Sequence, residues 1–256
     1  MGVMGDVAVS VGIPSLAGPF ILAAAAYLLA GLILFLFLRL DPFIITRMID
    51  TAKQDHTKGQ EAAAVHAENK RGIIVGAAVM ILTQIVMVAI MTMTPVQMKH
   101  HGHSLDAVGL VIGFHIAAMY LPSLFTGVLV DRLGRKAMAA ASGITLLLAG
   151  LIAAVAPGDS MNLFVIALSL LGLGWNFGVI SGTAFLVDSA APSERAKTQG
   201  TVDVFIALSG AASGVLSGMI VAGSSYSALS IAGGLVSLLL IPAVIWYRGD
   251  RVLKEK

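Results

Sequence analysis

The sequence predicts an all-α polytopic transmembrane helical bundle, and its composition and the length of its charge-free runs are what predict it. Of its 256 residues, 57% are hydrophobic and 12% are charged, whereas a soluble domain carries about 25% charged residues. The mean hydropathy is +0.92. Long runs without Asp, Glu, Lys or Arg recur along the chain. A helix that crosses a bilayer needs about 20 mainly apolar residues, and these runs supply that length.

Seven spans follow from the charge-free runs. In order they are residues 16–38, 72–94, 108–130, 137–156, 161–187, 200–222 and 226–247. The last two share one run, which we divide at the turn-prone cluster 223–225. The third, fifth and sixth spans carry ladders of small residues, such as Gly174, Gly178 and Gly182, which let helix backbones approach closely. Packing alone explains nearly all of these glycines.

The basic residues predict the orientation of the spans. Fifteen of the 16 lysines and arginines fall in segments on one side, and Lys99 alone falls on the other. Because cytoplasmic loops are enriched in Lys and Arg, we expect the N-terminus outside and the C-terminus inside. The net charge is only +2 and sits at the span ends, which excludes nucleic acid as the main partner. The absence of cysteine excludes disulfides and thiolate metal sites.

One long connection suggests the domain organisation. Residues 1–39 hold an external segment and one helix, and residues 40–71 form a cytoplasmic central loop whose start, 43–49, is amphipathic. Residues 72–248 hold six helices, and residues 249–256 form a cytoplasmic tail.

A short basic loop joins the third and fourth spans, and each of its residues has a physical role. Its residues are Gly127, Asp131, Arg132, Gly134, Arg135 and Lys136. Gly127 permits close helix contact, and Asp131 is placed to cap the next helix. Gly134 allows a tight reversal, and the three basic residues hold the hairpin at the anionic inner surface. An ordinary basic turn is the simpler alternative, but the string GxxxDRxGRK is more specific than that.

This loop resembles the signature loop of the major facilitator superfamily. Further strings resemble a bacterial drug-efflux-type branch: residues 113–115, 119–123, 172–177 and 194–203. The resemblance implies a six-helix half preceded by one helix, equivalent to the sixth helix, the central loop and helices seven to twelve. It also implies a multidrug antiporter of a bacterial inner membrane, in which protons drive the efflux of hydrophobic small molecules.

The same resemblance implies partners and a missing part. The partners are the lipid bilayer, a small-molecule substrate, protons and an N-terminal half with helices one to five; no cofactor is implied. A non-transporting fragment or accessory protein that assembles with a partner half is the alternative.

Four residues inside the spans are candidates for substrate binding, since polar groups in a membrane are costly. Gln84 and Asn176 lie near the middle of their spans, which the resemblance equates with the cavity-lining seventh and tenth helices. Interhelical hydrogen bonds are the competing interpretation for both. Trp175 is suited to stack on a flat or cationic substrate, or it packs in the core. His115 is either a proton carrier or a packed neutral histidine.

Asp203 is the one acid inside a predicted span. It is a candidate for proton coupling or, alternatively, a gate residue that pairs with an arginine of the loop or with helix N-terminal amides. An external cluster of histidines, His100, His101 and His103, is expected to be a solvated loop. A metal site completed by Asp106 is the alternative.

Other classes of seven-span protein fit poorly. A retinal protein needs a Schiff-base lysine in its last helix, and the last two spans contain no lysine. An intramembrane enzyme is not indicated, because HExxH and GxSG are absent and no second acid accompanies Asp203 inside the spans.

Overall fold

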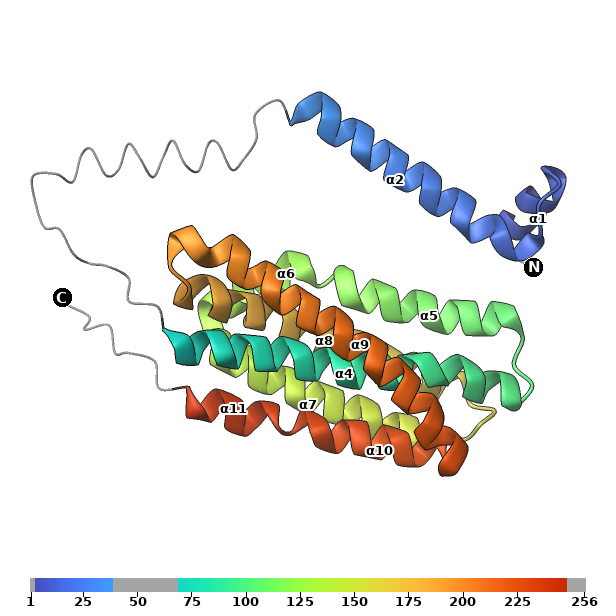
Figure 1. The fold of residues 1–256 in the computed structure, drawn as a ribbon. Helices are drawn as coiled ribbons and strands as arrows, with labels where there is room; N and C mark the ends of the chain where they lie inside the picture. Colours follow the sequence, from blue (N-terminus) through green and yellow to red (C-terminus); the bar gives the residue numbers. More distant parts are fainter. Residues whose placement is uncertain (1–2, 39–68, 248–256) are drawn as a thin grey trace, which may run out of the picture. The chain divides into compact units, whose positions relative to one another are not determined.

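The computed structural model describes residues 3–38 and 69–247, and all regular elements within them are helical (Figure 1). The chain divides into two units, Met1–Ala67 and Glu68–Lys256, which are described separately. Most of the predicted central loop 40–71 and all of the predicted tail 249–256 lie outside the described residues.

The first unit contains one long apolar helix. Its elements are α1 (Val3–Ser10), the 3-10 turn η1 (Ser15–Ala17) and α2 (Gly18–Phe37). α2 corresponds to the predicted span 16–38 and is long and apolar enough to cross a membrane. α1 was not predicted. It packs against α2 at Gly18, where the Met4 carbonyl leaves no room for a Cβ atom.

The second unit is a bundle of long helices (Figure 1). Its helices are α4 (Lys70–His100), α5 (Leu105–Tyr120), α6 (Ser123–Leu133), α7 (Arg135–Val155), α8 (Met161–Ser189), α9 (Arg195–Gly223), α10 (Tyr226–Ser237) and α11 (Leu240–Trp246), with the 3-10 turn η2 (Pro192–Glu194). α8 packs against α4, α5 and α7, and both α9 and α10 pack against α4. Phe164, Leu168, Leu171 and Phe185 of α8 are fully buried, so α8 forms the centre of the core.

The spans agree with the predicted all-α polytopic fold. Within the described residues, six helices or helix pairs can each cross a membrane, and a seventh is added if the bent pair α5–α6 counts as one span. The predicted division at 223–225 is confirmed, because α9 ends at Gly223 and α10 begins at Tyr226. The Ser225 side chain accepts a hydrogen bond from the Ala228 amide at 3.1 Å and so caps the start of α10.

Two spans differ from the expected continuous helices. The span predicted at 108–130 is bent by 42° between α5 and α6. Pro122 explains the break, because proline has no N–H and its ring clashes with the preceding turn. The span predicted at 72–94 instead continues through Pro95 to His100.

The glycine ladders differ in how closely they pack. In α8, the backbone at Gly178 lies against Thr83 and Ser142, and the backbone at Gly182 lies against Met80, as close packing predicts. In α5, a Cβ atom added at Gly109 or Gly113 would meet no heavy atom within 4 Å among the described residues. The predicted close helix contact is therefore absent at that face of the described bundle.

Candidate functional site

Central residues of several helices meet halfway along the bundle. Trp175 is the middle residue of the 29-residue α8, and Gln84 is one residue from the middle of the 31-residue α4. The Trp175 Nε1 atom donates a hydrogen bond to Gln84 Oε1 at 2.8 Å. Tyr120, the last residue of α5, places its ring edge-on to Trp175 with the centroids 6.0 Å apart. We call Gln84, Trp175 and Tyr120 the midplane cluster.

The midplane cluster is accessible and uncharged. Gln84 and Trp175 are half-buried, and Tyr120 is 60% exposed. The backbone of α9 lies close to the amide of Gln84, since a Cβ atom added at Gly210 would stand 3.0 Å from Gln84 Nε2. Two aromatic rings and one amide can bind a flat, uncharged ring by stacking and hydrogen bonding.

Asn176 lies beside this cluster but is fully engaged in packing. Its side chain is 1% exposed. Its Oδ1 atom accepts from Thr126 Oγ1 at 2.6 Å, and its Nδ2 atom donates to Met119 O at 2.8 Å and to Ser123 Oγ at 2.7 Å. These three bonds join α8 to both sides of the bend between α5 and α6, where the broken helix leaves a backbone carbonyl in need of a donor.

His115 is buried against α8. Its Nδ1 atom is 2.8 Å from the Leu168 carbonyl and therefore carries the hydrogen of that bond, while Nε2 has no partner among the described residues. The backbone of Gly172 leaves no room for a side chain beside the His115 carbonyl. Leu168 is seven residues, or roughly 10 Å, from Trp175 along α8, so His115 stands apart from the midplane cluster.

A second cluster lies around the loop between α6 and α7, at one end of the spans. Gly134 has φ +88°, which confirms the tight reversal expected there. Arg135 forms an ion pair with Asp188 at the end of α8 and donates from Nη2 to the Tyr247 hydroxyl at 3.1 Å. Lys136 Nζ donates to the Tyr247 carbonyl at 2.8 Å. We call Arg135, Lys136, Asp188 and Tyr247 the basic-loop cluster.

Aromatic rings support the guanidinium of Arg135. It lies 5.2 Å from the ring centroid of Phe185 and 5.5 Å from that of Tyr247. A planar guanidinium can stack and form hydrogen bonds at the same time, which a lysine ammonium does less well.

One of the expected roles in this loop is wrong. Asp131 does not cap α7, because Gly134 occupies the N-cap position and no side chain caps that helix. Asp131 instead is exposed at a hollow of about 530 Å³, which Gly127 and Asp188 also line. A Cβ atom added at Gly127 would meet no neighbouring atom within 4 Å among the described residues, so the close helix contact expected there stays a prediction. Arg132 is exposed.

Asp203 lies on a side of α9 that is exposed and does not pack against the rest of the second unit. It lies eight residues, or roughly 12 Å, into α9 and is exposed. Its Oδ1 atom accepts a hydrogen bond from Gln199 Nε2 at 2.8 Å. The buried residues of α9 are Val202, Gly210, Ser213 and Ser217, on the face that packs against the bundle.

The histidines near the end of α4 bind backbone carbonyls. His101 Nδ1 lies 2.9 Å from the Gln97 carbonyl, and His103 Nε2 lies 2.8 Å from the Gly158 carbonyl. Within the described ranges, no group of three metal-ligating side chains has the geometry to hold an ion.

Three residues of these clusters were not predicted from the sequence: Tyr120, Asp188 and Tyr247. Asp188 carries a usable signal, because it is the first acid after a long charge-free run and so marks the end of a span. Tyr120 and Tyr247 carry no comparable signal, since only the folded bundle brings them to Trp175 and Arg135.

The sequence profile described as Major Facilitator Superfamily matches residues 74–256. The chain belongs to the major facilitator superfamily. It is therefore an integral membrane protein of a family of transporters, whose members are generally carriers.

Three named proteins are similar to the chain in sequence. The chain is 74% identical over 250 residues to the uncharacterized MFS-type transporter YdeG of Bacillus subtilis, and 60% identical over 255 residues to the uncharacterized MFS-type transporter YddS of the same organism. These alignments cover 97% and 99% of the chain but 58% of each relative. The riboflavin transporter RfnT of Brucella anthropi is 34% identical over 160 residues, which cover 62% of the chain and 40% of that protein.

Proposed function

We propose that the chain is the C-terminal portion of a secondary transporter that exports hydrophobic small molecules from a bacterial cell in exchange for protons. The midplane cluster is its part of the substrate site. The observation that carries this proposal is the meeting of Trp175 and Gln84 at the middle of two spans, since transporters of this kind bind substrate at the midplane between two halves. The basic loop at Arg135 then faces the cytoplasm, with the N-terminus outside.

The outward face of α5 and the Asp203 end of α9 support a partner half. Ionisable residues within spans almost always face protein or a water-filled cavity, yet Asp203 is exposed on α9. Gly109 and Gly113 on α5 have open space where a second helix fits closely. In this proposal, residues 1–39 end the partner half, residues 40–71 connect it in the cytoplasm, residues 72–248 form the second half and residues 249–256 form the tail.

Two groups support a gate at the cytoplasmic side. The basic-loop cluster joins the start of α7 to the ends of α8 and α11 through Arg135 and Tyr247. Asp131 near the C-terminal end of α6 and Asp203 in the first third of α9 are exposed and are available to arginines or amides of a partner half. We assign the gate role to Asp203 first and proton coupling to it second.

Reconstitution in liposomes tests the partner half directly. We expect the chain alone to move no tetraphenylphosphonium under a proton gradient, and we expect transport when it is co-reconstituted with the part of YdeG that the chain does not match. The variant Trp175→Leu should then lower transport, and Trp246→Phe is the matched control. Robust transport by the chain alone would overturn the partner-half proposal, and equal activity of both variants would overturn the site.

The relative RfnT favours a second candidate substrate. Its name assigns it riboflavin, whose flat ring system carries amide-like edges. The two rings of the midplane cluster and the Gln84 amide match that chemistry. Transport of each compound, measured separately in the same liposomes, decides between the candidates, because only a transported compound moves under the proton gradient.

A further inference from the structure

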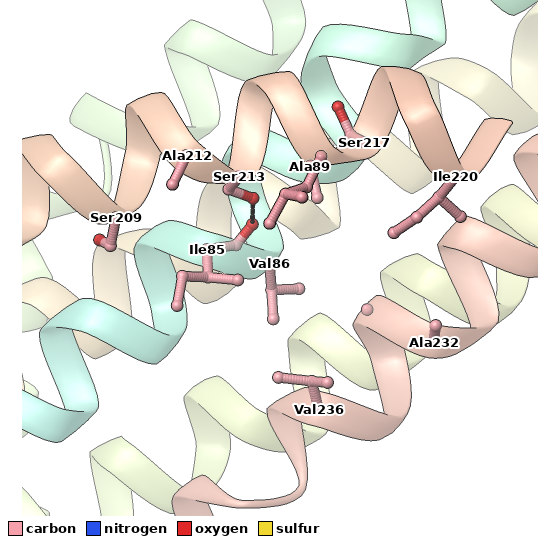
Figure 2. A pocket seen from close by; sticks show the side chains of 12 residues that line it. Ile85, Val86, Ala89, Ser209, Ala212, Ser213, Ser217, Ile220, Ala232 and Val236 are labelled. Carbon is pink, nitrogen blue, oxygen red and sulfur yellow. Dashed lines mark hydrogen bonds between the residues drawn. The ribbon is translucent and has the colours of Figure 1, made fainter. Parts of the chain in front are cut away.

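A hollow of about 240 Å³ lies between α4, α9 and α10. Figure 2 shows the side chains of Ile85 from α4, Ser213 from α9 and Val236 from α10 around it. Neither Gln84 nor Trp175 lines this hollow, so it is separate from the midplane cluster. We call it the lateral pocket.

Small side chains leave the space open. Seven of the twelve lining residues are alanine, glycine or serine. Ser213 Oγ donates to the Ile85 carbonyl at 2.7 Å and so holds α9 against α4 (Figure 2). α10 also lies close to α4, since a Cβ atom at Gly233 would stand 3.2 Å from Ile90 Cδ1. The pocket is the volume that remains between α9 and α10 where both pack on α4.

The pocket lies at the depth of lipid tails. Ile85 is the middle residue of α4, fifteen residues or roughly 22 Å from either end. The hydrocarbon core of a bilayer is about 30 Å thick, so this position is near its centre. The lining residues Leu216 and Ile220 are 53% and 43% exposed, which leaves the pocket open at the side.

The chemistry of the pocket selects an apolar occupant. No charged residue lines it. The three serine hydroxyls already donate to backbone carbonyls, from Ser209 to Ile206 at 2.9 Å, from Ser213 to Ile85 at 2.7 Å and from Ser217 to Gly214 at 2.8 Å. A polar ligand would thus lose its hydration without gaining a donor. The volume exceeds the roughly 150 Å³ at which an apolar protein cavity admits benzene.

We propose that the lateral pocket binds an acyl chain of a bilayer phospholipid. Atoms that line an unfilled hollow lose dispersion contacts on one side, and an alkyl chain restores them. The mouth of the pocket opens at the depth where the membrane supplies such chains. The bound chain fills the space between α9 and α10.

Photolabelling in nanodiscs tests this assignment. The nanodiscs contain phosphatidylcholine with a diazirine in the middle of one acyl chain, and labelled residues are mapped by mass spectrometry. We expect labelling of the pocket walls to exceed labelling of the exposed residues Leu148 and Leu151 of α7 by about tenfold, the ratio that a preference of about 1.4 kcal/mol gives.

A matched pair of variants ties the label to the pocket. Ala212 lines it, whereas its exposed neighbour Ala211 does not. Ala212→Phe fills the hollow and should reduce labelling of α10 to the level at α7, while Ala211→Phe should leave it unchanged. If Ala212→Phe fails to fold, Ala232→Phe fills the hollow from the opposite wall and should reduce the labelling of the pocket in the same way.

Three outcomes would overturn the proposal. Labelling of the pocket no stronger than that of α7 means that no acyl chain is held there. Equal labelling of the two phenylalanine variants means that the label is outside the hollow. Loss of labelling on addition of tetraphenylphosphonium places a transported molecule there instead of lipid.

Discussion

Replacing Asn176 with alanine should destabilise the protein more than any other single change in a polar side chain of α8. The amide joins α8 to both sides of the bend at Pro122 through three hydrogen bonds. Alanine removes all three and leaves the Met119 carbonyl without a donor. In hydrocarbon no water replaces that donor.

The expected magnitude follows from the bond count. Interhelical hydrogen bonds in membranes are worth about 0.6 kcal/mol on average and up to about 2 kcal/mol. Three bonds at these values sum to about 2–6 kcal/mol. Because Asn176 and Thr126 are buried but Ser123 is exposed, we expect a loss in the lower part of that range, about 2–4 kcal/mol, in the free energy of unfolding.

Unfolding by SDS in mixed micelles measures this loss. The chain has two tryptophans, and Trp175 adjoins the substituted residue, so its fluorescence reports on the region. Thr145→Ala is the control, because the Thr145 hydroxyl bonds only to the Ala141 carbonyl of its own helix, at 2.8 Å. That control should lose less than about 0.5 kcal/mol. If Asn176→Ala loses as little unfolding free energy as the Thr145→Ala control, the idea that the amide holds the bend is refuted.

The two clusters and Asp203 give further expectations for the assembled transporter. Arg135→Asp should abolish transport, because it replaces the ion pair with Asp188 by two like charges and removes the hydrogen bond and ring contacts of the guanidinium; adding Asp188→Arg should restore part of the transport, and no recovery would count against the pair. Gln84→Ala should weaken substrate binding about tenfold in equilibrium titrations, since it removes one hydrogen bond that orients Trp175. Asp203→Asn should impair proton-driven transport and substrate counterflow equally if it is a gate residue, and retained counterflow would assign it proton coupling instead.

Much of the fold was predictable because the bilayer dictates it. The spans need about 20 apolar residues each, and charges mark most of their ends. No charge marks the turn between the last two spans, and the Gly-Ser-Ser cluster 223–225 placed it correctly between Gly223 and Tyr226. Gly134 was predictable for a different reason, since a reversal with no spare residues requires a positive φ.

The contacts between helices were less predictable. Pro122 signals a break, but only the folded bundle shows that Asn176 bonds across it. Gln84 and Trp175 were each placed at mid-span by counting, whereas their mutual hydrogen bond depends on the rotation of α4 and α8 about their axes. Periodicity in an all-apolar helix does not fix that rotation, because every face is hydrophobic. The Asp131 cap failed for a local reason, because Gly134 already takes the N-cap position.

Fluorescence of Trp175 gives the most direct test of the midplane cluster as the substrate site. In the Trp246→Phe background Trp175 is the remaining tryptophan, and the chain in nanodiscs is titrated with riboflavin and, separately, with tetraphenylphosphonium. We expect that at least one of them quenches the fluorescence to saturation, that Gln84→Ala weakens this binding about tenfold, and that Ala212→Phe in the lateral pocket leaves it unchanged. Quenching by both that rises linearly without saturation, and equally in all variants, would contradict this expectation.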